Sequence, residues 1–192
     1  MNADHDVCPA SHAGMLDHPI RRVLQSPKRI LGPYLHHGET VLDIGCGPGY
    51  FSCAMARMVE PSGCIVAADL QDEMLAMLRD RAEKEGLDTL IRLHKTRSET
   101  LDLGSLGSFD FILAFYVVHE VPDASRFFEE VAAVLRPGGR ILVVEPTFHV
   151  SQEEFMETTN RARAAGLESE KGPYVLFSRT ALLKKTLKEE AT

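Results

Sequence analysis

Three glycines at alternate positions, Gly45, Gly47 and Gly49, follow a carboxylate at Asp43 and form the stretch best suited to hold a ligand. Glycine lets the backbone turn sharply and lets a ligand approach where a Cβ atom would collide with it. The helix expected after Gly49 would offer free N–H groups and a partial positive charge at its N-terminus. The stretch therefore predicts a loop that binds a small molecule of the nucleotide type.

The spacing within this loop limits which ligand it can bind. The dinucleotide-binding fingerprint needs a third glycine three residues after the second, and that position is Tyr50. A phosphate-binding loop needs a lysine, and none follows Gly49. The Asp43 carboxylate would repel a pyrophosphate but could hold a cationic amine. We therefore expect a ligand with few phosphates and some positive charge, and S-adenosylmethionine fits that description.

A second carboxylate, Asp69, ends the apolar run that begins at Cys64, one strand–helix–strand unit after Asp43. A carboxylate at such a strand end can accept hydrogen bonds from both hydroxyls of a ribose. Met74, in the helix expected next, could cover one face of an adenine or belong to the core.

A second group of chemically capable side chains follows the most apolar segment of the chain: Tyr116, His119 and Glu120. Ligands of open parallel sheets lie at the carboxyl ends of the strands, so these three are the candidate catalytic residues. His119 could act as a general base near neutral pH, or it could be a wall residue that only shapes the pocket; both interpretations stay open.

The elements that must position these residues alternate along the chain. Short apolar runs predict buried strands at residues 41–44, 64–68, 91–93, 109–118 and 140–144. Apolar residues at helical spacing predict helices over 51–59, 74–82 and 127–135, and a loop and helix over 148–165. Two more strands follow residue 167, joined by a turn at either Gly172-Pro173 or Phe177-Ser178. The alternation predicts an α/β fold, a doubly wound Rossmann-like domain with a mostly parallel sheet.

Composition narrows the class of protein. A chain of 192 residues suits one such domain, and a net charge of -7 argues against a nucleic-acid partner. No apolar run approaches the about 20 residues of a membrane span, and the first residues lack a signal-peptide core. The four cysteines lack paired spacing, so reduced thiols are expected. We predict a cytoplasmic protein without a membrane partner, present as a monomer or homodimer.

The first part of the chain, residues 1–37, is expected to be an arm followed by two short helical pieces broken at Pro27, with the catalytic domain over 38–192. Folding of residues 1–18 over the ligand as a lid is one option for this arm. Cys8, His12 and His18 could be imagined as zinc ligands, but structural zinc sites need four ligands with tighter pairing. No metal is predicted.

Two motifs resemble class I S-adenosylmethionine-dependent methyltransferases, in particular their small-molecule branch. The sequence Val-Leu-Asp-Ile-Gly-Cys-Gly-Pro-Gly at 41–49 resembles the family's first motif, and 135–146 resembles a later one that closes at the ligand edge with Glu145. Residues 179–183 resemble its last, antiparallel strand, so seven strands are implied. The resemblance, good over about residues 38–147, implies S-adenosylmethionine as cofactor. Together with the properties of the residues described above, this resemblance implies a set of cofactor-binding residues. They are Asp43, Gly45, Cys46, Gly47, Gly49, Asp69, Leu70, Met74, Ser98, Glu99 and Phe115.

The chain departs from the family after the third expected strand. Family members often read Gly-Asp/Asn-Ala-Glu there, and the Asp or Asn accepts from the adenine amino group. Here Arg97 stands at that position and has donors only. The backbone N–H of Ser98 could still reach a ring nitrogen, and Arg97 could point outward to solvent.

The reaction implied is in-line attack by a small-molecule acceptor on the methyl carbon. Positioning can supply roughly 7–11 kcal/mol of such a barrier, so few catalytic residues need be visible. Phenol, carbon, thiol, amine and metalloid acceptors all stay open. The alternatives are a catalytically silent S-adenosylmethionine-binding protein and a nicotinamide-dependent oxidoreductase, which the missing third glycine and Asp43 oppose.

Overall fold

The structure is a computed structural model, and it describes residues 25–186 of the chain. The predictions made for residues 1–18, for the first helical piece near residues 20–24 and for the zinc site fall outside these residues. The division of the chain at residue 37 stays a prediction.

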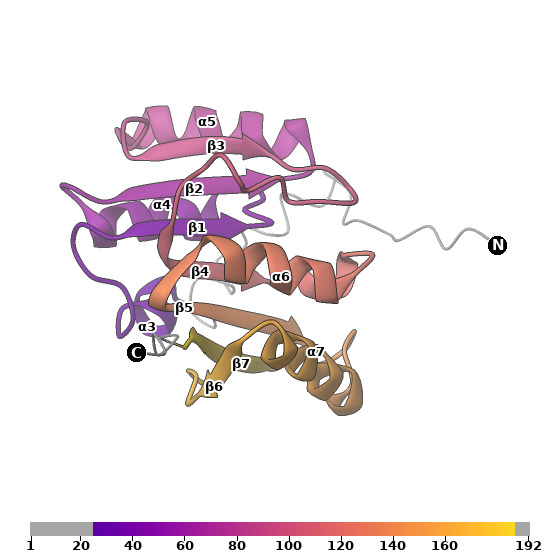
Figure 1. The fold of residues 1–192 in the computed structure, drawn as a ribbon. Coiled ribbons are helices and arrows are strands. Elements are labelled where there is room, and N and C mark those ends of the chain that lie inside the picture. Colours follow the sequence, from indigo (N-terminus) through magenta and orange to yellow (C-terminus); the bar gives the residue numbers. More distant parts are fainter. Residues whose placement is uncertain (1–24, 187–192) are drawn as a thin grey trace.

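A seven-stranded sheet forms the centre of the fold (Figure 1), in the order β3-β2-β1-β4-β5-β7-β6. β1 to β5 are parallel, and β7 runs antiparallel to both β5 and β6, between which it lies. This arrangement confirms the predicted doubly wound, mostly parallel sheet with an antiparallel last strand. The strands are β1 (Thr40–Ile44), β2 (Cys64–Asp69), β3 (Ile91–Lys95), β4 (Phe109–Phe115), β5 (Leu135–Pro146), β6 (Leu167–Glu170) and β7 (Ser178–Lys185).

Helices cover both faces of the sheet (Figure 1) and bury its alternating apolar side chains. One core joins α3, α4 and α5 to Val41 and Phe111, and the other joins α6 and α7 to Leu42 and Ile112. The helices are α3 (Pro27–Leu31), α4 (Tyr50–Val59), α5 (Asp72–Glu85), the short 3-10 helix η2 (Val118–Glu120), α6 (Ala124–Val134) and α7 (Gln152–Ala164). Both faces of β1 and β4 are therefore shielded from solvent, which explains their nearly continuous apolar sequence.

Local side-chain bonds fix where α6 and α7 begin. The Asp123 carboxylate accepts from the backbone N–H groups of Ser125 and Arg126 at the start of α6. Ser151 and Glu154 exchange hydrogen bonds at the start of α7 in a capping box. Because these caps end the preceding loops, they set the position of both loops at the carboxyl edge of the sheet.

The bounds of β3, β4 and β5 differ from the sequence prediction by two residues or more. β4 ends at Phe115 rather than at residue 118, because Tyr116 takes a left-handed backbone conformation with φ +63°. β5 begins at Leu135 rather than at 140, with a register shift against β4 near its start. β3 continues to Lys95, two residues beyond the predicted end. The turn between β6 and β7 spans residues 171–177, so it contains Gly172-Pro173 and stops where Phe177 meets Ser178.

Strands β1 and β4 are neighbours, and their carboxyl ends lie side by side. A Cβ atom at Gly45, just after β1, would lie 2.9 Å from Cγ2 of Val117, just after β4. A glycine is therefore required here so that the two loops can approach. Within residues 25–186, no helix is both long enough and apolar enough to cross a membrane.

Candidate active site

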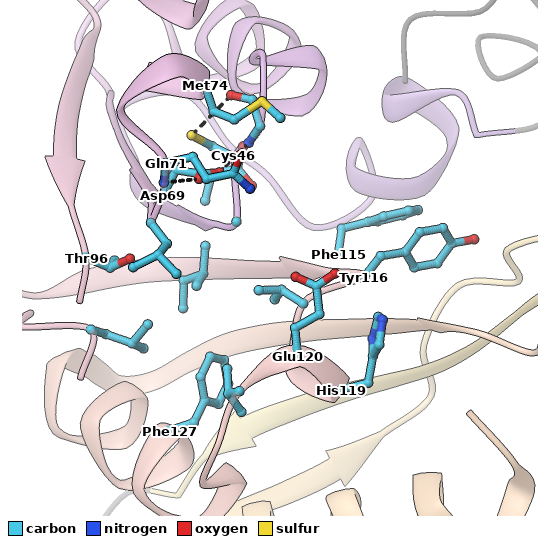
Figure 2. A pocket seen from close by; sticks show the side chains of 18 of the residues that line it. Cys46, Asp69, Gln71, Met74, Thr96, Phe115, Tyr116, His119, Glu120 and Phe127 are labelled. Carbon is cyan, nitrogen blue, oxygen red and sulfur yellow. Dashed lines mark hydrogen bonds between the residues drawn. The ribbon is translucent and has the colours of Figure 1, made fainter. Parts of the chain in front are cut away.

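A cavity of about 330 Å³ opens at the carboxyl edge of the parallel strands, within the size range of small-molecule sites. Figure 2 shows its lining in two groups, with Asp69, Gln71 and Met74 on one side and His119 and Glu120 on the other. Of the residues predicted from the sequence, the structure brings together Asp43, Gly45, Cys46, Gly47, Asp69, Leu70, Met74, Ser98, Glu99, Phe115, Tyr116, His119 and Glu120. We name the first group the cofactor end and the second the acceptor end.

Gly49 is the one predicted site residue that does not line the cavity. A Cβ atom at this position would lie 2.1 Å from Cδ1 of Leu78, and its φ of +87° is left-handed. Gly49 is therefore explained by the close approach of Leu78 of α5 to the residue that precedes α4. At Gly47, by contrast, a Cβ would meet no protein atom within 4 Å, so the space above this glycine is open.

Asp69 holds the glycine loop in place from the end of β2. Its Oδ2 accepts from the Gly47 N–H at 2.9 Å, and its Oδ1 accepts from the Gln71 N–H at 2.9 Å. Burial raises the pKa of the Asp69 carboxyl, and the hydrogen bonds that it accepts from backbone N–H groups partly oppose that rise. A carboxylate oxygen can accept two hydrogen bonds, so each oxygen can still accept one from a ligand.

Asp43 is only 2% exposed although it is among the residues that line the cavity. The Ser52 hydroxyl of α4 donates to its Oδ2 at 2.5 Å. This bond ties the end of β1 to the first turn of α4, across the glycine loop. The loop is thus fastened by a carboxylate from each of two neighbouring strands.

The turn after β3 closes the cofactor end, and the Arg97 side chain at its edge is mostly exposed. The Arg97 side chain is 75% exposed and forms an ion pair with Asp102 at 3.6 Å, which agrees with the outward-pointing alternative. Glu130 of α6 fixes this turn, because its carboxylate accepts from the Leu101 N–H at 2.9 Å and from the Thr100 hydroxyl at 2.9 Å. The buried Thr96 lines the cavity beside it.

Glu145 and His119 form the principal polar pair of the acceptor end. The Glu145 carboxylate is 1% exposed, accepts from the Val118 N–H at 2.9 Å and bonds the Nδ1 of His119. Burial alone would lower the pKa of His119, but the bond to Glu145 and the charges of Glu145 and Glu120 outweigh burial and raise it. The His149 ring stacks on the His119 ring at 5.8 Å. Figure 2 shows His119 and Glu120 extending toward the rings of Phe115 and Tyr116.

Tyr116 follows the end of β4 and lines the cavity. The Gln25 side-chain amide donates to its hydroxyl at 2.8 Å, and the Ser178 hydroxyl lies 2.6 Å from the same oxygen. The hydroxyl thus links the segment before α3, the end of β4 and the start of β7. This bonding makes Tyr116 a fixed part of the cavity rim.

The charge of the lining is mainly negative. Among the described residues, the lining includes two arginines, Arg97 and Arg126, and six carboxylic acids, which are Asp43, Asp69, Glu99, Glu120, Asp123 and Glu130. Such a lining attracts a cation and repels a pyrophosphate. In the part of the chain that the structure describes, no group of three or more His, Cys, Asp or Glu side chains is arranged to hold a metal ion.

Sequence reasoning missed several lining residues, including Thr96, Gln71, Glu130 and His149. Glu130 lies on the exposed side of a helix pattern, and no local signal links it to residues 100–102. His149 falls within the segment expected to border the acceptor, but nothing in its immediate sequence marks it as a site residue.

Comparisons with known proteins agree with this geometry. A family model described as a methyltransferase domain matches residues 42–143. The chain is 32% identical over 108 residues to the ubiquinone/menaquinone biosynthesis C-methyltransferase UbiE of Pasteurella multocida, covering 56% of this chain and 40% of that protein. It is 35% identical over 108 residues to the protein of the same name from Hahella chejuensis, covering 56% and 43%. The chain therefore matches less than half the length of these curated relatives.

A solved structure shares the whole fold. The crystal structure of a SAM dependent methyltransferase from Aquifex aeolicus has a TM-score of 0.83 to this chain, at 24% sequence identity. The match covers 94% of this chain and 100% of that one.

Proposed function

The chain belongs to the methyltransferase domain family, in its class I group that uses S-adenosylmethionine, and on this premise we propose that the cavity binds S-adenosylmethionine and directs its methyl group to a small-molecule acceptor. The observation that carries the proposal is the negatively charged cavity around a glycine loop held by Asp69. A cofactor with a sulfonium and an ammonium group suits such a lining, whereas a dinucleotide does not.

The residues at the cofactor end fit the parts of this cofactor. Asp69 has two acceptor positions left for the ribose hydroxyls, and the open space at Gly47 lets a ligand lie against the backbone. The Asp43 carboxylate supplies negative charge beside the loop, where the amino group would be held. The turn fixed by Glu130 offers Thr96 and backbone groups to the adenine in place of the usual Asp or Asn side chain.

When bound, S-adenosylmethionine supplies a methyl carbon on a positively charged sulfur that departs with the bonding electron pair. The chain then has to hold the acceptor in line and keep water out. Tyr116, His119 and Glu120 are the residues we assign to the acceptor end. The curated relatives are named as C-methyltransferases of ubiquinone and menaquinone biosynthesis, which favours a small-molecule acceptor.

Isothermal titration calorimetry tests the cofactor. S-adenosylmethionine and its demethylated product S-adenosylhomocysteine should bind with micromolar dissociation constants, and NADH should bind at least about 100-fold more weakly. Equal or tighter binding of NADH would overturn the assignment and favour the oxidoreductase.

A second experiment separates an enzyme from a silent binding protein. Incubation with methyl-labelled S-adenosylmethionine and a panel of small phenols, amines, thiols and carbon acids should label at least one acceptor. Tight cofactor binding with no labelled product from any class would favour the silent binding protein.

A further inference from the structure

We propose that His119 is the general base of the reaction, that Glu145 is the positioning residue which holds it in the required tautomer, and that the acceptor is a weakly acidic hydroxyl compound of the phenol or enol type. This inference rests on the proposed function and narrows it to one acceptor chemistry.

The bond between Glu145 and His119 determines which ring nitrogen can accept a proton. An ionised carboxylate only accepts hydrogen bonds, so the Nδ1 of His119 must carry its proton when it faces Glu145. In the neutral ring, Nε2 is then the atom with a free lone pair. His119 lines the cavity and its side chain is 24% exposed, so a ligand can reach this ring.

Glu145 is itself fixed before any ligand arrives. It is almost fully buried on β5, and its other oxygen accepts from the Val118 N–H at 2.9 Å in the first residue of η2. The same carboxylate therefore holds both the backbone and the side chain of the segment that carries His119. A second fixed group that orients the base is the arrangement found where enzymes use histidine as a general base.

The charged and titratable groups around His119 all favour its protonated form or leave it unchanged. Glu145 faces it from β5 and Glu120 from η2, and both carboxylates raise its pKa. His149 stacks on the ring from the loop after β5. On β7, Arg179 stands opposite Glu145 in the strand register. The outcome is an imidazole that is a stronger base than free histidine.

A general base accelerates methyl transfer most for an acceptor that must lose a proton as it reacts, and this requirement limits the acceptor class. A thiol has a pKa of about 8.5 and is partly ionised at neutral pH, and a neutral amine attacks without losing a proton first. An aliphatic alcohol is too weak an acid for imidazole. A phenol, with a pKa of about 10, gains most from a base of slightly raised pKa that accepts its proton as the bond to carbon forms.

The step balances. The hydroxyl oxygen of the acceptor forms a bond to the methyl carbon, and the carbon–sulfur bond breaks with its electron pair moving to sulfur. The hydroxyl proton moves to Nε2 of His119, and the resulting imidazolium keeps its Nδ1–H on Glu145. The products are the methyl ether, S-adenosylhomocysteine and a proton that His119 later releases to solvent.

Nuclear magnetic resonance of the cofactor-free protein, labelled with ¹⁵N in its histidine rings, tests the pair without turnover. Neutral His119 should show the Nδ1–H tautomer and titrate above the ordinary histidine pKa of about 6.5. Glu145→Gln should lower this pKa, while the exposed β6 substitution Glu168→Gln should leave it unchanged. An Nε2–H tautomer in the wild-type protein, which needs no variant to fold, would overturn the proposal.

Kinetics test the acceptor class. A panel of phenols, each paired with the aniline of the same ring, should give methylated phenols at a rate that falls as the pH drops below the His119 pKa. His119→Ala should lose at least about 100-fold in kcat and lose this acidic limb, with the S-adenosylhomocysteine Kd within threefold of wild type. Cofactor binding with transfer only to anilines, or to no phenol, would overturn this inference and leave the cofactor assignment standing. Absence of cofactor binding would instead refute the proposed function.

Discussion

Removal of the Asp69 carboxylate gives the sharpest test of the cofactor end. Asp69 is 8% exposed, and each of its oxygens already accepts one backbone N–H at 2.9 Å. We expect the remaining acceptor positions to bind the two ribose hydroxyls. A hydrogen bond to a charged group contributes about 1.5–3 kcal/mol.

Two lost bonds would weaken binding by about 3–6 kcal/mol, but Asp69→Ala also frees the N–H groups of Gly47 and Gln71 to bind water or ligand. We therefore expect the Kd of S-adenosylhomocysteine to rise between about 10-fold and 1000-fold in Asp69→Ala, where about 1.4 kcal/mol is tenfold. Asp69→Asn keeps one acceptor oxygen, so its Kd for S-adenosylhomocysteine should rise only about tenfold.

Calorimetry at pH 7.5, with circular dichroism to confirm the fold, measures this effect. The matched control is Asp72→Ala, whose side chain is 80% exposed and pairs with Lys95 only at the surface, so its Kd should stay within twofold. Because burial raises the pKa of Asp69, wild-type affinity should also fall as the pH drops through that raised pKa, since the protonated carboxyl loses an acceptor. An unchanged Kd in folded Asp69→Ala would refute the assignment and place the ribose elsewhere.

Three further predictions concern the surroundings of the cofactor end. Arg97→Asp should leave the cofactor Kd unchanged or lower it, because this side chain is 75% exposed; a loss above tenfold would show that Arg97 itself holds the cofactor. Glu130→Ala should raise the same Kd about tenfold by releasing the turn that it fixes, and an unchanged Kd would separate that turn from the cofactor. Gly49→Ala should lower the free energy of unfolding in urea by about 2–4 kcal/mol, because its Cβ would lie 2.1 Å from Leu78 and φ is left-handed. Gly86 is the control, because its φ is +67° and an added Cβ would meet no atom within 4 Å. Gly86→Ala should therefore lower the free energy of unfolding by only about 1–2 kcal/mol. Equal losses in the two variants would refute the packing argument.

The sequence allowed the sheet and thirteen of the lining residues to be predicted, because both depend on short local patterns. Apolar runs mark the strands, and Asp69 is recognisable from its place at a strand end. The early end of β4 was not predictable, because a tyrosine carries no local signal for the φ of +63° that Tyr116 adopts. The partnership of Glu145 with His119 was missed because the two residues meet only after β4 and β5 pair. Gly49 fits the same motif whether it contacts a ligand or a neighbouring helix, and only the packing of Leu78 distinguishes these cases.

The position of β7 between β5 and β6 has a consequence for biosynthesis. Among the strands of residues 25–186, β6 is hydrogen-bonded only to β7, so it lacks this partner strand until β7 has been made. Because β7 also completes the outer side of β5, which carries Glu145, and supplies Ser178 to the Tyr116 hydroxyl, the acceptor end is unfinished until that moment. A ribosome stalled before residue 178 would therefore present a chain whose acceptor end is incomplete and whose strand β5 lacks one of its two neighbours, β7.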